Sequence, residues 1–376
     1  MKIGIPAETR AGESRVAATP ETVKKLVSGG LHQVIVQAGA GVAASIPDEQ
    51  YQAAGATIVS SAVEIYSQAQ LIAKVRGPSE AELAMMNKDT VLIGLLDARA
   101  PGVPAMLAKQ GITAFSLELL PRITRAQSMD VLSSQANIGG YKAVLIAANT
   151  YQRFMPMLMT AAGTVKAARV LILGAGVAGL QAIATAKRLG AVIEAFDVRP
   201  DVKEQVESLG AKFVEVPLTD TEKEIAKGQG GYAREMTDDY KQRQAALIHE
   251  RAKAADIIIT TALIPGRPAP VLVTEETVKA MKPGSVIVDM AVEAGGNCPI
   301  SELDKIVVKH GVTLVGIANL PALVAADASA LYARNVLTFL GVLLDAKTGA
   351  FTINREDEIV AGTLVCTAGE VANKSK

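Results

Sequence analysis

The chain has 376 residues, enough for about two domains, and its 38 basic and 38 acidic side chains cancel to zero net charge. This balance provides no electrostatic attraction toward nucleic acid, so we exclude nucleic acid as a partner. A hydrophobic content of 49% with only 3% aromatic residues is typical of an α/β protein with an aliphatic core. The two cysteines, Cys298 and Cys366, lack the spacing of metal ligands, and we predict no metal site.

The first 120 residues alternate strand-like apolar runs with helical patterns, which predicts a parallel sheet. The expected strands are residues 2–6, 34–36, 57–59, 71–75, 91–96 and 113–117. Among the helices between them, residues 21–27 carry the clearest start signal, with Thr19 as N-cap and Pro20 at the first helical position.

Residues 128–162 contain few helix breakers before Pro156 and predict one long connecting helix. The methionines within it, Met155, Met157 and Met159, are expected to fill gaps in the core.

A three-glycine turn follows the expected strand that begins at Arg169. Gly174 permits the tight turn, Gly176 leaves no side chain between backbone and a pyrophosphate, and Gly179 lets helix and strand pack closely. The next helix directs free N–H groups at the phosphates, and Gly190 is expected to end it. Because strand, turn, helix and a later acid fall in order, the pattern predicts dinucleotide binding more strongly than the glycines alone.

Asp197 lies 18 residues after Gly179, close to the spacing of about 20 that is typical of the ribose ligand. Its carboxylate favours NAD over NADP, because it accepts from a free 2′-hydroxyl and repels a 2′-phosphate. Two roles stay open for Arg199: contact with a 2′-phosphate, or a solvated arginine at the start of a helix before Pro200.

Residues 219–239 form a long polar segment in which Ile225, Tyr232 and Met236 are the sizeable apolar side chains. A loop of this length is usually functional or disordered. An ordinary loop anchor and a lid that closes over a nucleotide both fit this composition.

The second series of strands is expected at residues 192–196, 212–216, 256–261, 285–290 and 312–317, followed by a long helix at 325–344 and short strands at 351–353 and 363–366. We predict an α/β protein with two Rossmann-like, doubly wound parallel-sheet domains joined by long helices. Residues 1–132 and 328–376 are expected to form a discontinuous first domain, and residues 133–327 an NAD(H)-binding domain. The most apolar late stretch, 336–344, is too short to cross a bilayer, so the chain itself is expected to be soluble.

Several long motifs resemble those of the alanine dehydrogenase and transhydrogenase superfamily. They are Glu-Ser-Arg-Val-Ala-Ala-Thr-Pro at 13–20, Ala-Lys-Val-Arg at 73–76 and the loop at 289–296. The segments 121–137, 260–270 and 294–298 narrow the match, because they closely resemble the NAD(H)-binding component of the proton-translocating nicotinamide nucleotide transhydrogenases.

This resemblance implies a site with two sets of residues. The nicotinamide end is implied to consist of Arg122, Gln127, Asp130 and Ser133, with Tyr232 on a mobile loop that closes over the nucleotide. The rest of the cofactor site is expected from Gly174, Ala175, Gly176, Val177, Ala178, Gly179, Asp197, Val198, Arg199, Thr261, Ala262 and Leu263. By their residue types alone, Ser128 or Asp130 also fits a helix cap, and Arg122 and Arg125 fit solvated side chains.

The resemblance also implies partners. Members of this group bind NAD(H), form homodimers, and dock onto an NADP(H)-binding component and a membrane-embedded proton-translocating component. Hydride then passes directly between the two nicotinamides. The expected location is peripheral, on the cytoplasmic side of the inner membrane.

Two other functions stay open, an alanine dehydrogenase and a non-catalytic NAD-responsive interaction module. An alanine dehydrogenase needs a carboxylate-binding Arg and Lys, here matched by Arg15 and Lys74, and a histidine for proton transfer. The strand expected to carry that histidine, 91–97, has none. The three histidines, His32, His249 and His310, occupy positions typical of structural or solvated side chains, and Arg15 and Lys74 are then expected to pair with Glu13 or Glu8.

Overall fold

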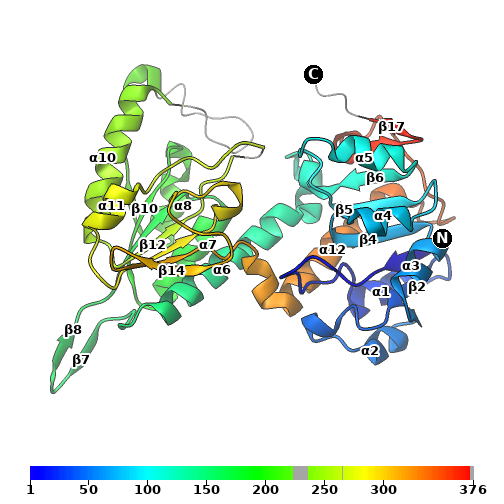
Figure 1. The fold of residues 1–376 in the computed structure, drawn as a ribbon, viewed down its shortest axis with the longest axis horizontal. Coiled ribbons are helices and arrows are strands. Elements are labelled where there is room, and N and C mark those ends of the chain that lie inside the picture. The colour runs from blue at the N-terminus through cyan, green and yellow to red at the C-terminus, as the bar shows by residue number, and fades with distance from the viewer. Residues whose placement is uncertain (223–235, 265, 373–376) are drawn as a thin grey trace. The chain divides into compact units, whose positions relative to one another are not determined.

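The computed structural model describes residues 1–222, 236–264 and 266–372 (Figure 1). The chain divides into two compact units, each built on its own sheet. Unit 1 comprises Met1–Gln135 and Pro321–Lys376, and unit 2 comprises Ala136–Leu320. The α/β fold class predicted from the alternating pattern is confirmed.

Unit 1 contains an eight-stranded sheet in the order β17-β16-β6-β5-β4-β1-β2-β3. All neighbouring strands from β3 to β6 are parallel, whereas β16 and β17 are antiparallel additions at one edge. The strands are β1 (Lys2–Ile5), β2 (Gln33–Gln37), β3 (Thr57–Val59), β4 (Leu71–Arg76), β5 (Val91–Leu95), β6 (Thr113–Ser116), β16 (Leu364–Thr367) and β17 (Glu370–Val371). The helices are α1 (Pro20–Val27), α2 (Asp48–Ala53), α3 (Ala62–Gln68), α4 (Glu80–Ala84), α5 (Val103–Lys109), α12 (Ala325–Leu343) and α13 (Glu358–Thr363), with short 3-10 turns at η1 (Val42–Ala44), η2 (Leu117–Leu119), η3 (Thr124–Met129) and η6 (Leu320–Val324).

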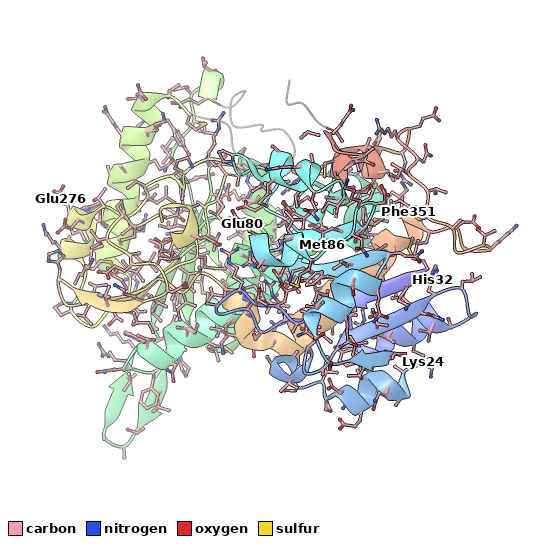
Figure 2. All side chains as sticks on the ribbon, turned by 45° about the vertical axis from the view of Figure 1, so that its right-hand side comes forward. Lys24, His32, Glu80, Met86, Glu276 and Phe351 are labelled. Atoms are coloured by element: carbon pink, nitrogen blue, oxygen red, sulfur yellow. The ribbon has the colours of Figure 1, made fainter. Side chains whose placement is uncertain are left out.

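Local sequence signals predicted helices α1 and α12. Helix α1 starts with Thr19 as N-cap and Pro20 at its first position, and the Thr19 N–H donates to the Thr22 hydroxyl at 3.0 Å. Helix α12 buries one apolar face, on which Phe339 packs edge-on against Phe115 of β6 with ring centroids 5.8 Å apart. Residue Phe351 (Figure 2), expected in a strand, makes only a single bridge to Leu344.

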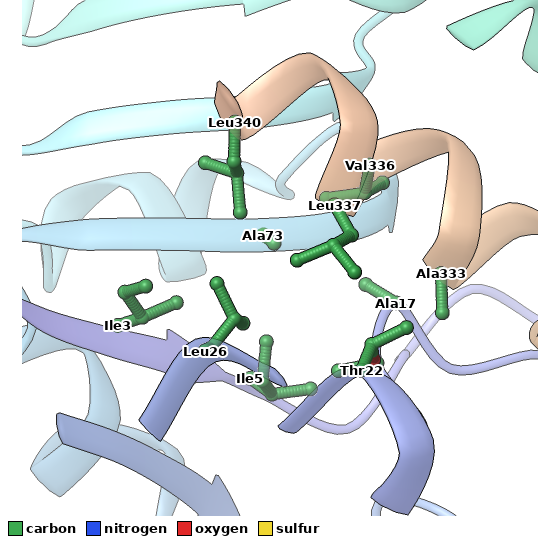
Figure 3. Close-up of a pocket in the computed structure, with 11 residues that line it drawn as sticks. Ile3, Ile5, Ala17, Thr22, Leu26, Ala73, Ala333, Val336, Leu337 and Leu340 are labelled. Atoms are coloured by element: carbon green, nitrogen blue, oxygen red, sulfur yellow. The ribbon is translucent and has the colours of Figure 1, made fainter. Parts of the chain in front are cut away.

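A small pocket inside unit 1 lies between β1, β4, α1 and α12 (Figure 3). Its volume is about 10 Å³, and apolar side chains such as Ile3, Leu26, Ala73 and Leu340 line it. An apolar space of this size is a minor packing gap and holds no nucleotide.

Unit 2 contains a seven-stranded sheet in the order β11-β10-β9-β12-β13-β15-β14. Only β14 pairs antiparallel, at one edge. The strands are β9 (Arg169–Leu173), β10 (Val192–Phe196), β11 (Lys212–Val214), β12 (Ile257–Thr260), β13 (Val286–Asp289), β14 (Ile306–Lys309) and β15 (Val312–Val315). The helices are α7 (Val177–Arg188), α8 (Lys203–Ser208), α10 (Asp238–Ala254) and α11 (Glu275–Ala280), with short turns at η4 (Pro200–Val202) and η5 (Val292–Ala294).

The connecting helix expected over 128–162 is shorter than predicted. Helix α6 spans Val131–Thr150, and a hairpin of β7 (Leu158–Thr160) and β8 (Gly163–Val165) follows it and projects from unit 2 (Figure 1). Short apolar runs fit helix and strand equally well, and Gly163, with φ of 126°, favours the turn of the hairpin. Met155 is buried as predicted, but Met157 and Met159 are 60% and 72% exposed, so their assignment to the core was wrong.

Candidate dinucleotide-binding site

The glycine turn between β9 and α7 has the geometry that its spacing predicts. Gly174 has φ of 102°, a conformation that side chains disfavour. A Cβ on Gly179 would lie 1.8 Å from the Gly174 carbonyl oxygen, so only glycine allows α7 to start this close to the turn. By contrast, a Cβ on Gly176 would meet no atom within 4 Å, which leaves this side of the turn open to a ligand.

Helix α7 begins at Val177, directly after Gly176 as N-cap, and runs for 12 residues. The N–H groups of its first turn have no acceptor within the helix, and the helix dipole adds partial positive charge there. Together with the open face at Gly176, these groups suit a pyrophosphate. Gly190, with φ of 85°, lies just after the helix end, as predicted.

Asp197 follows β10 and lies against the glycine turn. Its carboxylate accepts from the Ala175 N–H at 2.8 Å and from the Arg199 N–H at 2.9 Å. The Arg199 guanidinium also donates to both carboxylate oxygens, at 2.9 and 2.8 Å. Arg199 therefore starts a short helical turn, as one interpretation proposed. It is paired rather than solvated, because the Asp197 carboxylate, whose side chain is 7% exposed, lies within reach of its guanidinium. Val198, the residue between Asp197 and Arg199 in the sequence, packs against the hydrophobic core of unit 2.

The segment after β12, with Thr261, Ala262 and Leu263, lies beside the same turn. The Thr261 hydroxyl donates to the Gly174 carbonyl at 3.0 Å, and the Thr261 backbone N–H donates to the Leu173 carbonyl at 2.8 Å. The apolar side chain of Leu263 is 46% exposed. Pro265, in the same motif, lies outside the described residues.

Two buried residues that the sequence analysis did not assign support this segment. The Asn297 side chain accepts from the Ala262 N–H at 3.1 Å and donates to the carbonyls of Ala262 and Pro270 at 2.9 and 2.8 Å. Asp289, at the end of β13, accepts from the Asn297 N–H at 3.1 Å and from the Thr260 hydroxyl at 3.0 Å. An acid at a strand end followed by Gly-Gly-Asn is the sequence signal from which this arrangement could have been found.

The residues expected at the nicotinamide end belong to unit 1, whereas the glycine turn belongs to unit 2. Arg122 and Gln127 are exposed, and Gln127 lies in η3. Asp130 immediately precedes α6 and accepts from the Ser133 N–H at 3.0 Å and from the Ser133 hydroxyl at 2.5 Å. Asp130 thus caps α6, which is the structural role that its residue type suggested.

Two further expectations concern Arg125 and Tyr232. Arg125 is not simply solvated, because its guanidinium forms an ion pair with Asp357. Tyr232, the expected loop tyrosine, lies outside the described residues, as does most of the polar segment around it.

The cations that an amino acid dehydrogenase would use for a carboxylate are buried and paired inside unit 1. Arg15 donates to both Glu13 oxygens at 2.7 and 2.6 Å and to the Gln135 side chain at 2.8 Å. Lys74, 1% exposed, contacts Glu82 at 2.7 Å and Glu8 at 3.7 Å. The predicted pairing with Glu13 and Glu8 is confirmed, and Glu82 is an additional partner.

Burial raises, and pairing lowers, the pKa of each of the two carboxyl groups that contact Lys74, those of Glu8 and Glu82. Burial raises the pKa of Glu8 above its usual range, against the attraction of Lys74. Burial also pushes the pKa of Glu82 upward, but hydrogen bonds from Lys74 and the Ser79 N–H outweigh it and lower that pKa. The cluster is therefore a set of mutually satisfied charges inside unit 1.

The histidines have peripheral partners. His249 bonds to the Thr277 hydroxyl at 3.0 Å, and His310 contacts Glu275 at 2.8 Å. His32 (Figure 2) lies in the connection before β2. His249 and His310 thus have hydrogen-bond partners of their own within unit 2.

Two other kinds of site are absent from the described part of the chain. Within residues 1–222, 236–264 and 266–372, no group of three or more His, Cys, Asp or Glu side chains is arranged to hold a metal ion. No helix among those residues combines the length and the hydropathy needed to cross a bilayer.

Comparison with known proteins gives matches over the whole chain. The family model "Alanine dehydrogenase/PNT, N-terminal domain" matches residues 4–139, and "Alanine dehydrogenase/PNT, C-terminal domain" matches residues 143–374. The chain is 55% identical to an NAD(P) transhydrogenase subunit alpha polypeptide of Rhodospirillum rubrum, over 99% of this chain and 98% of that protein. It is 31% identical to alanine dehydrogenase of Bacillus subtilis, over 86% and 80%. The solved structure of transhydrogenase from Sinorhizobium meliloti superposes with a TM-score of 0.89 at 48% identity, covering 99% of this chain and 100% of that one.

Proposed function

The chain belongs to the alanine dehydrogenase/PNT family, and from this premise we propose that it is the NAD(H)-binding component of a proton-translocating transhydrogenase. In this proposal NAD(H) binds here, NADP(H) binds to a partner component, and hydride passes directly between them. A membrane-embedded component couples the transfer to proton translocation. The observation that carries the proposal is the open glycine turn beside Asp197, in a chain 55% identical to a transhydrogenase α-subunit polypeptide.

The glycine turn fits the dinucleotide at three points. The pyrophosphate is assigned to the open face at Gly176 and the N–H groups that begin α7. The adenosine ribose is assigned to Asp197, with Val198 and Arg199 beside it. The exposed Leu263 and the backbone of Thr261 and Ala262 supply the remaining wall.

The nicotinamide end is assigned to Arg122, Gln127, Asp130 and Ser133, with Tyr232 as a covering residue. Arg122 has donors for a carboxamide oxygen, and Gln127 has both a donor and an acceptor. Hydride exchange between two nicotinamides requires the reacting carbons to be held in register at about 3–3.5 Å, and it requires no general acid or base. A set without histidine suits this reaction.

The alternative, an alanine dehydrogenase, is supported by the 31% identical relative. Two observations weigh against it. Oxidative deamination needs a group that transfers protons, and strand β5 offers no histidine. Arg15 and Lys74 are already neutralised by Glu13, Glu82 and Glu8, so a substrate carboxylate would have to displace buried ion pairs.

A reconstitution assay tests these proposals. The chain is mixed with an NADP(H)-binding transhydrogenase component, and hydride transfer from NADH to an NADP⁺ analogue is followed by absorbance. We expect transfer only in the mixture. Reduction of NAD⁺ by alanine with no partner would establish the alternative, and NADH binding without transfer in the mixture would favour a non-catalytic NAD-responsive module.

We extend the proposal to assembly as a homodimer, docked at the cytoplasmic side of the inner membrane. The β7–β8 hairpin, which projects from unit 2 (Figure 1), supports a protein contact, because the apolar side chains of Met159 within it and of Phe154 and Met157 just before it are exposed. Met159→Glu should weaken self-association measured by sedimentation, and an unchanged dimer would remove the hairpin from the interface.

A further inference from the structure

Helix α6 packs against the start of α7 at a glycine. A Cβ on Gly140 would lie 2.1 Å from the Ala178 carbonyl oxygen, 2.8 Å from its carbonyl carbon and 3.0 Å from its Cα. Cβ atoms in proteins essentially never approach other heavy atoms below 3.0 Å. Because the obstructing atoms are backbone, no side-chain rotation relieves the contact.

The first turn of α7 makes a second close contact, with the glycine turn. A Cβ on Gly179 would lie 1.8 Å from the Gly174 carbonyl oxygen, so the first turn of α7 already rests on the glycine turn. Ala178, which Gly140 approaches, is adjacent to Gly179 in this turn. Its N–H belongs to the first turn of α7, where the backbone donors have no acceptor within the helix.

We propose that Gly140 is a positioning residue for the dinucleotide, because its missing side chain fixes where the first-turn N–H groups of α7 lie. The inference rests on the proposed NAD(H) site at the glycine turn. Moving the contact from 2.1 to 3.0 Å requires a shift of 0.9 Å between the two helices. Losing a hydrogen bond to a charged group weakens binding by roughly 10- to 100-fold, so misplaced N–H groups should bind the pyrophosphate less tightly.

The test compares Gly140→Ala with Gly341→Ala. Gly341 lies within α12, and its Cβ would meet no atom within 4 Å, so this variant controls for replacing a helical glycine by alanine. NADH, ADP-ribose and adenosine are titrated calorimetrically into wild type and both variants. We expect Gly140→Ala to raise the Kd of NADH and ADP-ribose by roughly 10- to 100-fold and to leave that of adenosine unchanged, because adenosine has no phosphate. Gly341→Ala should match wild type for all three ligands.

Each other outcome has a distinct meaning. Equal NADH affinity in both variants overturns the role of Gly140, and so does an equal loss of adenosine binding, which indicates general damage to unit 2. A wild-type protein that binds none of the ligands contradicts the proposed NAD(H) site instead.

Hydrogen exchange on the wild-type protein keeps the inference testable should Gly140→Ala fail to fold. ADP-ribose, but not adenosine, should slow exchange of the amides at residues 138–142 together with those at the start of α7. Unchanged exchange in α6 while α7 becomes protected overturns the inference.

Discussion

The two sheets share one strand order but differ at the point where that order reverses. In unit 1 the six parallel strands run β3-β2-β1-β4-β5-β6, and in unit 2 they run β11-β10-β9-β12-β13-β15. In each, the first strand of the sheet along the chain lies between the second and the fourth. Ligands of such sheets bind at this reversal, beyond the carboxyl ends of the strands.

Unit 2 leaves its reversal point open, with glycines after β9 and the Thr261 segment after β12. Unit 1 fills the corresponding region with its own charges. Glu8, which follows β1, accepts from the N–H groups of Val75 and Arg76 at the end of β4, at 2.6 and 3.3 Å, and Lys74 contacts it from the same strand. One topology thus carries a binding site or a buried ion cluster, depending on the residues of its first connection.

The largest effect is expected from Lys74→Met in unit 1. This change leaves the Glu82 and Glu8 carboxylates without their buried cation, which costs about 3–5 kcal/mol of unfolding free energy. Urea unfolding measures this loss, and Lys74→Met/Glu82→Gln should recover part of it. A variant as stable as wild type would show that the cluster does not hold unit 1 together.

Asp197→Ala tests the open reversal point of unit 2. We expect NADH binding to weaken by roughly 10- to 100-fold, since a hydrogen bond to a charged group contributes about 1.5–3 kcal/mol. Rejection of NADPH should relax as the repulsive carboxylate is removed. Fluorescence titration with both nucleotides measures the two changes, and unaltered affinities would exclude Asp197 as the ribose ligand.

Gln127→Asn tests whether the nicotinamide end is separable from the rest of the dinucleotide site. Shortening the side chain by one methylene should slow hydride transfer by about tenfold through misplacement while NADH affinity stays near wild type. Single-turnover transfer with the NADP(H)-binding component measures the rate. An unchanged rate removes Gln127 from the site.

The smallest effect is expected from the pH dependence of Glu8→Gln. Burial raises the folded-state pKa of Glu8 above its ordinary value of 4.5. Protonation of Glu8 therefore stabilises the folded state below pH 4.5, and this stabilisation is lost as the pH rises through the folded-state pKa. Relative to Glu8→Gln, wild type should lose unfolding free energy from acidic to neutral pH, as followed by urea unfolding. A flat difference would indicate that the cluster is open to water.

The sequence predicted the elements whose signals are local. Thr19 and Pro20 marked the start of α1, and the expected strand at 192–196 matches β10. The helix over 128–162 was wrong beyond Thr150, because the short apolar run around Met157 and Met159 leads into a projecting hairpin that only the tertiary structure distinguishes from a helix.

For the site, spacing predicted the glycine turn, whereas its supports depend on contacts between distant segments. The approach of Gly140 to Ala178 joins positions 38 residues apart, and Asn297 reaches Ala262 from 35 residues away. The pairing of Arg199 with Asp197 is close in sequence, but it depends on the rotamer of a side chain for which the sequence left two other roles open. No periodicity encodes these contacts.

The hydroxyl of Thr261 ties the end of β12 to the carbonyl of Gly174. This bond forms within unit 2 itself, so part of the ordering entropy that a flexible phosphate loop loses on binding is already lost when unit 2 folds. Under the proposed function, in which NAD(H) is taken up and released at every turnover, nucleotide exchange can then proceed without re-forming this part of the site.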